Sequence, residues 1–283
     1  MAGRVVCPFC NGLDHYKFNN SHTYKCKNCK KKFNAKIGTI FENTKVPLSK
    51  WFVSIYIATS HKKGISSLQL GKDIGVTQKT AWFILHRIRE MLKTKAPGML
   101  NGMVEVDETF IGGAEKFKHK SKKKKKIRGY GNRSIVFSTL ERQGSVWTTM
   151  VKRVTAETLK PIIRARIDKS NVIVTDGFGS YNELEKEYKG HEVVNHEQGE
   201  YVNGEFHTNT IEGFFSQLKR GIYGIYHSVS PKHLQKYCDE FCFRYNTRKS
   251  SEEGRFNYAF LTCNSRLTYK NLIGKKNLNI LHT

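Results

Sequence analysis

The apolar residues in segment 207–221 recur with the period of a helix. Apolar side chains form one face at a 3.6-residue spacing, and Glu212 and Lys219 lie two turns apart on a polar line beside it. Asn209 stands where a helix cap is expected, and a carboxylate three residues later favours a helix N-terminus. Glu212 is therefore either part of a cap or one of a set of carboxylates that do chemistry. The apolar face consists of Ile211, Phe215, Leu218 and Ile222.

A second helical pattern covers residues 66–93. It predicts a short helix, a turn around Gly75 and a longer helix that Thr77 caps. Two helices joined in this way are typical of a helix-turn-helix, whose second helix enters the major groove of DNA, although any two short helices could give the same pattern. The polar residues left for the groove are Gln78, Lys79, Trp82, His86 and Arg89, of which we expect Gln78, Lys79 and Arg89 to bind DNA.

Apolar runs beyond this helical region predict strands. In 103–113 the alternation places Glu105 and Asp107 on the same side of a strand. In 171–181 a near-continuous apolar run ends in Asp176 and glycine, which is typical of a buried strand with a polar residue at its carboxyl end. The other expected elements are strands at 134–140, 145–151 and 191–196 and a helix at 155–167.

This order of elements predicts an α/β protein with a mixed sheet flanked by helices, as in the ribonuclease H-like fold. In that fold the first strand, the fourth strand and a late helix bring carboxylates to one edge, and Asp107, Asp176 and Glu212 occupy those elements. Clustered carboxylates repel one another unless they hold hard cations such as Mg²⁺ or Mn²⁺. Two such ions can stabilise the oxygens of a phosphoryl transfer. Each residue alone could be a surface acid or a cap, so the prediction rests on their joint placement.

Near the start of the chain, two C-x-x-C pairs are separated by 15 residues. Four thiolates at this spacing are typical of a zinc ribbon, in which they close a tetrahedral structural Zn²⁺ site. So small a module has little core, and we expect the metal to supply its folding free energy. The alternative, disulfides, is rare inside cells. Cys238 and Cys242 are expected on a helix, with their side chains in the protein core. The expected zinc ligands are Cys7, Cys10, Cys26 and Cys29.

The charge of the chain predicts the class of its partner. It has 49 Lys and Arg against 24 Asp and Glu, a formal net charge of +25, which favours a polyanion, by default nucleic acid. No apolar run is long enough to cross a membrane and no apolar signal segment opens the sequence, so we expect a cytoplasmic, nucleoid-associated protein. A basic tract is expected either to bind phosphates or to form a solvated loop in the free protein. Its lysines are Lys122, Lys123, Lys124, Lys125 and Lys126.

These signals divide the chain into four parts. The segment 96–102 contains proline and glycine and marks a boundary. Before it, residues 1–100 hold 18 Lys and Arg but only four acidic residues, as expected for a part that holds nucleic acid. We expect a zinc ribbon in 1–36, a helix-turn-helix DNA-binding domain in 37–97, a catalytic domain in 101–250 and a C-terminal tail in 251–283.

Three stretches of the sequence resemble a known family. They are VDETFIGG at 106–113, VTDGFGSY at 174–181 and HTNTIEGFFSQLKRGIYGIYHSVSPKHLQKY at 207–237. Together with the zinc ribbon and the helical segment before them, they cover nearly the full length. The chain resembles the DDE transposases of the bacterial insertion-sequence group that is related to eukaryotic Merlin elements.

The resemblance implies roles for individual residues. Asp107, Asp176 and Glu212 would be the three catalytic carboxylates, with 35 residues between the last two, the interval usual for DDE enzymes. Lys219 matches the family's pairing of a carboxylate with a lysine and would lie near the scissile phosphate. Some members of this group carry Asn as the third catalytic residue, and Asn209 lies close by. Because a carboxylate is the better Mg²⁺ ligand, we expect Glu212.

The resemblance also implies an activity. The protein would bind the terminal inverted repeats of its insertion sequence in double-stranded DNA, cleave a phosphodiester to free a 3′-OH, and transfer that end into target DNA. It would work as a homodimer or a higher assembly. Two alternatives remain open from the sequence: a zinc-ribbon DNA-binding regulator with an inactive nuclease-like domain, and a metal-dependent DNA nuclease such as a junction resolvase.

Overall fold

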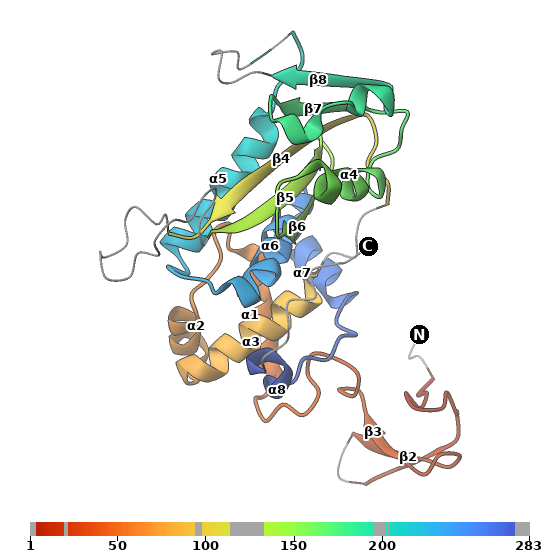
Figure 1. Cartoon of the computed structure of the whole chain (residues 1–283). Coiled ribbons are helices and arrows are strands. Elements are labelled where there is room, and N and C mark those ends of the chain that lie inside the picture. The colour runs from red at the N-terminus through yellow and green to blue at the C-terminus, as the bar shows by residue number, and fades with distance from the viewer. Residues whose placement is uncertain are drawn as a thin grey trace.

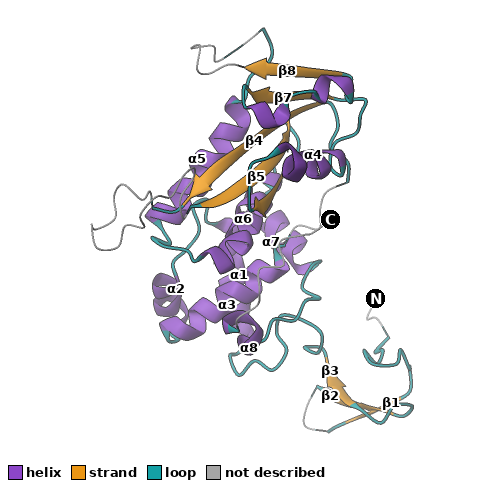
Figure 2. Cartoon of the chain, viewed as in Figure 1, coloured by secondary structure: helices purple, strands orange, loops and turns teal. Residues whose placement is uncertain are grey.

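The computed structural model describes residues 4–19, 22–93, 98–113, 133–194, 202 and 204–274. Figures 1 and 2 show a small sheet near the N-terminus, a group of helices, and a larger sheet that packs against helices. In Figure 1 the small sheet stands apart from the rest of the chain. None of the helices in these ranges has both the length and the hydropathy that crossing a membrane requires.

The small sheet consists of three antiparallel strands, β1 (His15–Lys17), β2 (Thr23–Cys26) and β3 (Lys32–Asn34), in that order. Among the described residues of this module, only Cys7, Cys26 and Phe33 are buried apolar side chains of its core. So few buried side chains cannot offset the conformational entropy of ordering the module. So small a core is consistent with the expectation that a metal held by the cysteines supplies the folding free energy.

The helical part contains α1 (Leu48–Ser60), α2 (Ser67–Ile74) and α3 (Gln78–Met91). Gly75 ends α2 in a left-handed conformation with φ of 60°, which glycine adopts without strain. The hydroxyl oxygen of Thr77 accepts a hydrogen bond from the N–H of Thr80 and caps α3. The predicted short helix, turn and capped longer helix are confirmed, and they pack on α1 through Leu70, Ile84 and Ile55.

The segment expected to be a C-terminal tail instead completes this helical part. Its helices are α7 (Glu252–Phe260) and α8 (Tyr269–Ile273). Ala259 of α7 is fully buried in the same core as α1 and α3. Arg87 of α3 donates hydrogen bonds to the carbonyl oxygens of Leu267 and Ile40. The sequence missed this role because the contacts join residues about 180 positions apart.

The larger sheet has five strands in the order β6-β5-β4-β7-β8. β4, β5 and β6 are antiparallel, whereas β7 and β8 run parallel to β4. This mixed sheet confirms the ribonuclease H-like arrangement expected from the element order, with the first strand of the domain at its centre. The strands are β4 (Met103–Ile111), β5 (Ser134–Glu141), β6 (Val146–Val151), β7 (Val172–Asp176) and β8 (Gly190–Val194).

Helices cover both faces of this sheet. α4 (Ala156–Arg164) lies on one face, and α5 (Asn209–Gly224) and α6 (Pro231–Asn246) lie on the other. In β4, Val104 and Val106 pack toward α4, whereas Ile111 packs toward α5. Because successive side chains alternate, Glu105 and Asp107 share the α5 face, as predicted. Cys238 and Cys242 are buried in the core on this face, which confirms their expected place.

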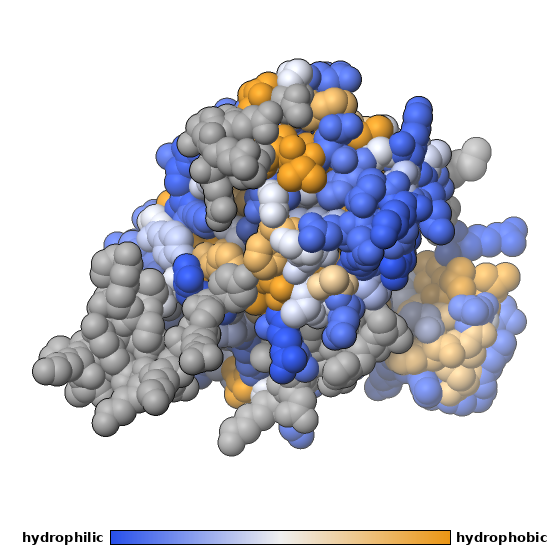
Figure 3. Space-filling model, turned by 45° about the horizontal axis from the view of Figure 1, so that its top comes forward, coloured by the Kyte–Doolittle hydropathy of each residue, from blue (hydrophilic) through white to orange (hydrophobic). Residues whose placement is uncertain are grey.

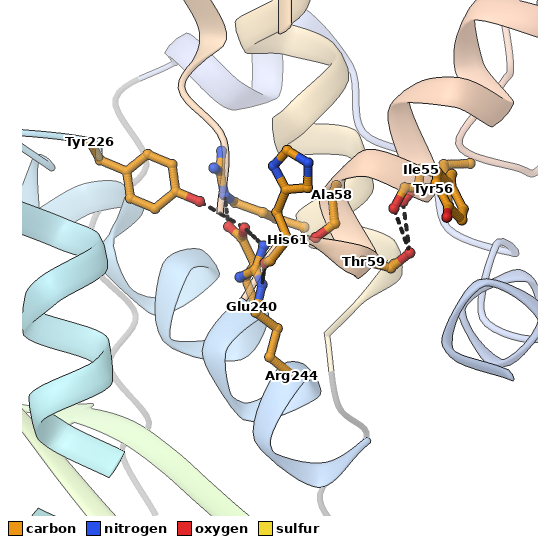
Figure 4. Close-up of polar contacts among 9 residues, drawn as sticks. Ile55, Tyr56, Ala58, Thr59, His61, Tyr226, Glu240 and Arg244 are labelled. Atoms are coloured by element: carbon orange, nitrogen blue, oxygen red, sulfur yellow. Dashed lines mark hydrogen bonds and ion pairs between the residues drawn. The ribbon is translucent and has the colours of Figure 1, made fainter. Parts of the chain in front are cut away.

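A buried carboxylate, Glu240 of α6, joins the helical part to the larger sheet (Figure 4). It accepts hydrogen bonds from Arg89 of α3 (2.5 Å), from Arg244 (2.5 Å) and from the hydroxyl of Tyr226 (2.8 Å). Arg244 also donates to two backbone carbonyl oxygens near the end of α1. Burial raises the pKa of Glu240, but the charges of Arg244 and Arg89 outweigh it and lower this pKa to about 2. An ionised cluster therefore holds α1, α3 and α6 together.

This cluster corrects one expected DNA contact, because Arg89 is only 2% exposed and paired with Glu240. His86 on the same side of α3 is fully buried against the rings of Trp82 and His233. Burial lowers the pKa of His86 to about 2, so this histidine is neutral. The part of this side of α3 that carries His86 and Arg89 therefore packs on α6 instead of facing a DNA groove.

Candidate active site

The centre of the larger sheet provides a place for a binding site. β4 pairs with β5 on one side and with β7 on the other. The strand that follows β4 in the chain, β5, lies on one side of this pair, whereas the strand that follows β7, β8, lies on the opposite side. In open α/β sheets, ligands bind at such a switch point, outside the carboxyl ends of parallel strands. The pairing of β4 with β7 ends where Glu105 lies opposite Val174. Two residues further along each strand stand Asp107 and Asp176.

Asp107 lies half-buried on the α5 face of β4. Its carboxylate accepts a hydrogen bond from the backbone N–H of Glu108 (2.6 Å). Burial raises the pKa of Asp107 well above its usual range, and the negative charges of Asp176, Glu108 and Glu212 raise it further. Asp176, Glu108 and Glu212 therefore lie near enough for their charges to act on the Asp107 carboxylate. A divalent cation is the partner that relieves such repulsion.

Asp176 and Glu212 lie on other elements. Asp176 is half-buried at the end of β7, and its carboxylate accepts a hydrogen bond from the N–H of Phe178 (3.2 Å) in the turn that follows. Glu212 is exposed in the first turn of α5. Within the described ranges no three acidic groups approach one another within 4.8 Å. Closing a metal site would therefore require these carboxylates to approach one another.

The start of α5 differs by one residue from the expected cap. Thr208, rather than Asn209, occupies the cap position, and its side chain makes no cap hydrogen bond. The Thr208 hydroxyl instead lies 3.4 Å from the carboxylate of Glu212. Asn209 is the first residue of the helix and is exposed. Asn209 and Glu212 thus share the first turn of α5.

Glu105 fixes this helix start to β4. Its carboxylate is fully buried, and one oxygen accepts a hydrogen bond from the backbone N–H of Ile211 (2.8 Å). The other oxygen lies 3.2 Å from Nε of Arg142 and 3.6 Å from Nδ1 of His207. A carboxylate at a helix N-terminus satisfies an unpaired N–H and is stabilised by the helix dipole. Glu105 therefore caps α5 from the strand that carries Asp107.

Arg142 holds the chain that leads into α5. Its guanidinium donates to the carbonyl oxygens of Glu205 (2.7 Å) and His207 (3.0 Å) while it pairs with Glu105. Arg142 thus ties the backbone of residues 205 and 207 to the side chain of Glu105. The period of β4 placed Glu105 on the correct side, but nothing in the sequence identified its partners.

Glu108 adds a fourth carboxylate on the other face of β4. The hydroxyl of Tyr181 donates to it at 2.5 Å. Burial raises the pKa of Glu108, the hydrogen bond from Tyr181 lowers it, and the charge of Asp176 raises it. Glu108 follows Asp107 directly, and Tyr181 lies in the same stretch as Asp176. Both stretches carry the family resemblance, and this proximity was the signal by which the sequence could have identified the two residues.

The other residues predicted to contact DNA lie on α5, on α3 and in the lysine tract. Lys219 is half-buried on α5, two turns beyond Glu212. Gln78 and Lys79 are exposed at the start of α3, where Gln78 donates to the hydroxyl of Ser67 and Lys79 lies over the ring of Tyr269. The predicted lysine tract, Lys122 to Lys126, lies outside the described residues.

The four cysteines of the N-terminal module meet as predicted. Their ligand atoms all lie within 4.8 Å of one another, and Sγ–Sγ distances are 3.6 Å for Cys7 and Cys29 and 3.5 Å for Cys10 and Cys26. Tetrahedral zinc with Zn–S bonds of about 2.3 Å separates its sulfurs by about 3.8 Å, whereas a disulfide needs about 2.05 Å. All four are free cysteines, so the donor set fits Zn²⁺ rather than a disulfide.

Comparisons with known proteins relate the chain to transposases. Residues 99–246 match the model of a family described as the ISXO2-like transposase domain. The chain is 30% identical over 253 residues, 85% of each protein, to an uncharacterized protein in transposable element ISH50 of Halobacterium salinarum. It is also 30% identical over 106 residues, 36% of this chain and 80% of the relative, to an uncharacterized transposase-like protein of Haemophilus influenzae. A Mos1 transposase paired-end complex is 13% identical over 79% of this chain and 78% of that one, with a TM-score of 0.30.

Proposed function

This chain belongs to the ISXO2-like transposase family, and on that premise we propose that it cleaves DNA at the ends of its insertion sequence and joins them to target DNA. The observation that carries the proposal is the placement of Asp107 and Asp176 two residues beyond the paired part of the adjacent strands β4 and β7, at the switch point of the sheet. There, burial and the neighbouring negative charges raise the pKa of Asp107. Such a group of carboxylates is costly for the fold unless it binds cations.

Oxygen ligands of this kind suit Mg²⁺ or Mn²⁺, and Asp107, Asp176 and Glu212 would hold two such ions. When bound, these ions stabilise the attacking and leaving oxygens of an in-line phosphoryl transfer. Other residues of the chain would position the metal ligands and the DNA. Glu105 sets the start of α5 against β4, and Lys219 on the same helix would contact the scissile phosphate.

The remaining parts of the chain would hold DNA. The net charge of +25 supports binding to double-stranded DNA at both the element ends and the target. We assign end binding to the zinc ribbon in 1–36 and to the helices in 37–97, with contacts from Gln78 and Lys79. The Lys122 to Lys126 tract would bind phosphates of the catalytic domain's substrate. Paired ends require a homodimer or a higher assembly.

Substitution of the carboxylates tests this proposal. Asp107→Asn, Asp176→Asn and Glu212→Gln should each abolish Mg²⁺-dependent cleavage of a labelled end fragment while leaving affinity for that fragment nearly unchanged. Asn209→Ala is the matched control on the same helical turn and should cleave. If Glu212→Gln cleaves normally and Asn209→Ala does not, the third ligand is misassigned. If all of these variants cleave as the wild type does, the site lies elsewhere.

The same assay separates the proposal from its alternatives. A regulator with an inactive domain would bind the end fragment but would not cut it with either metal. A nuclease of the resolvase kind would cut branched DNA in preference to linear ends and would not join a 3′-OH to a target.

A further inference from the structure

One face of the zinc ribbon carries aromatic rings that its core does not use. In an antiparallel sheet, directly opposed residues point to the same face. Tyr16 is opposed to Lys25, and Lys25 is opposed to Lys32. Phe18 continues β1 two residues beyond Tyr16, and its N–H donates to the carbonyl oxygen of Thr23. Tyr16, Phe18, Lys25 and Lys32 therefore share one face, which we call the outer ribbon face.

The opposite face already has a structural role. There His15 lies edge-on to Tyr24, with ring centroids 5.0 Å apart, and Tyr24 stacks on Phe33 at 5.5 Å. Phe33 and Cys26 are buried on this side. The inner face thus forms the small core of the module, and the rings of the outer ribbon face contribute nothing to it.

The outer rings are open to solvent. Tyr16 is 59% exposed and Phe18 is 36% exposed. Phe9, in the turn of the first cysteine pair, is 46% exposed. In Figure 3 the ribbon at the right of the view shows apolar and hydrophilic residues intermingled on its surface. Exposed rings gathered on so small a module mark an interaction surface.

Each of these rings has a lysine over it. The Nζ atom of Lys27 lies 5.1 Å from the ring centre of Tyr16, and that of Lys32 lies 5.2 Å from the ring centre of Phe18. Lys31 stands in the same way at 4.9 Å from Phe9. Rings paired with ammonium groups are the combination that binds single-stranded nucleic acid, because bases stack on the rings and phosphates attract the ammonium groups.

We propose that the outer ribbon face binds unpaired nucleotides of DNA, with bases stacked on Tyr16 and Phe18 and phosphates bound by Lys27 and Lys32. A base in an intact duplex is already stacked on its neighbours, so only unpaired bases can use the rings. At an exposed ring, a stacked base is held more strongly than an ammonium, so nucleotides can displace the lysines onto phosphates. The inference deepens the proposed function, because unpaired bases arise where transposon ends are opened and cut.

Binding by the full-length, zinc-loaded protein tests this assignment. The probes are a labelled single-stranded oligonucleotide, a blunt duplex of the same sequence, and that duplex with an unpaired 3′ flank. The variants are Tyr16→Leu and Phe18→Leu, which keep an apolar side chain but remove the flat ring. Tyr258→Leu is the matched control, because Tyr258 of α7 has a similar exposure of 54%. Zinc content is measured for every variant, to show that the ribbon is intact.

Each ring substitution should weaken binding to the single strand and to the flanked duplex about tenfold and leave the blunt duplex within about twofold. Tyr258→Leu should match the wild type on all three probes. Equal losses on the single strand and the blunt duplex, or no loss on either, would overturn the assignment. The test is independent of catalysis, because binding is measured without added Mg²⁺ and the expected pattern is the same whether or not the wild type cleaves DNA.

Discussion

Replacing Glu105 tests whether this buried carboxylate positions α5, the helix that carries the proposed metal ligand Glu212. Glu105→Ala removes the acceptor of the Ile211 N–H (2.8 Å) and the partner of Arg142 (3.2 Å). A hydrogen bond to a charged group contributes about 1.5–3 kcal/mol, and breaking a buried ion pair costs about 3–5 kcal/mol. Because Arg142 is 20% exposed, water compensates part of its charge, and we expect a total loss of about 3 kcal/mol.

The expected effect on catalysis exceeds the effect on stability. Without its cap, the first turn of α5 is no longer tied to β4, and Glu212 shifts relative to Asp107. A displacement of about 1 Å at a catalytic group can lower a rate about 100-fold. We therefore expect single-turnover cleavage to fall about 100-fold at saturating protein and Mg²⁺. Glu105→Gln keeps an oxygen for the Ile211 N–H and should recover most of the rate.

Urea unfolding measures the loss of stability, and single-turnover cleavage of one end fragment measures the loss of catalytic rate. Glu240→Gln is the control, because it also alters a buried carboxylate held by arginine but lies in the cluster that joins α3 to α6. It should lose stability and keep most of its cleavage rate. If Glu105→Ala and Glu240→Gln lose cleavage equally, or if Glu105→Ala cleaves as the wild type does, the positioning role is wrong.

Three further predictions concern zinc, DNA and pH. Cys7→Ser should release Zn²⁺, unfold the ribbon and weaken end binding, because the module has almost no core; metal analysis and limited proteolysis check this, and an unchanged zinc content would contradict it. Lys219→Ala should lower cleavage more than it lowers end affinity over a salt series, whereas equal losses would reduce Lys219 to an ordinary phosphate contact. The pKa of Glu240 is lowered from 4.5 to about 2 in the fold, so the stability it provides is present above pH 4.5 and is lost as the pH falls toward 2. The urea midpoint of the wild type should fall more steeply over this range than that of Glu240→Gln, and parallel curves would refute the assignment.

The sequence predicted most of the secondary structure because strand faces, turns and helix caps depend on residues that are close together in the chain. The period of two in β4 placed Glu105 and Asp107 on one face, and the spacing of the cysteines sufficed to bring the four thiols together. A turn with Gly75 and a cap at Thr77 depend on neighbours within a few residues, and both are present.

Contacts between distant residues account for what the sequence could not reveal. Arg89 has the charge and spacing of a DNA contact, but its partner Glu240 lies 151 residues away. Ile211 meets its acceptor Glu105 across 106 residues, so the cap of α5 could not be found from the residues around it. Ala259 joined the helical core for the same reason.

We propose that carboxylates of the sheet and of α5 perform DNA strand transfer, and a joining assay tests this proposal most directly. Wild-type protein and Asp107→Asn are each incubated with a labelled end fragment that already carries a free 3′-OH, with supercoiled target DNA and Mg²⁺. We predict that the wild type produces labelled target joined to the fragment, that EDTA abolishes the product, and that Asp107→Asn binds the fragment without joining it. Joined product from Asp107→Asn at the wild-type level, or cutting of DNA by the wild type without any joined product, would contradict the account.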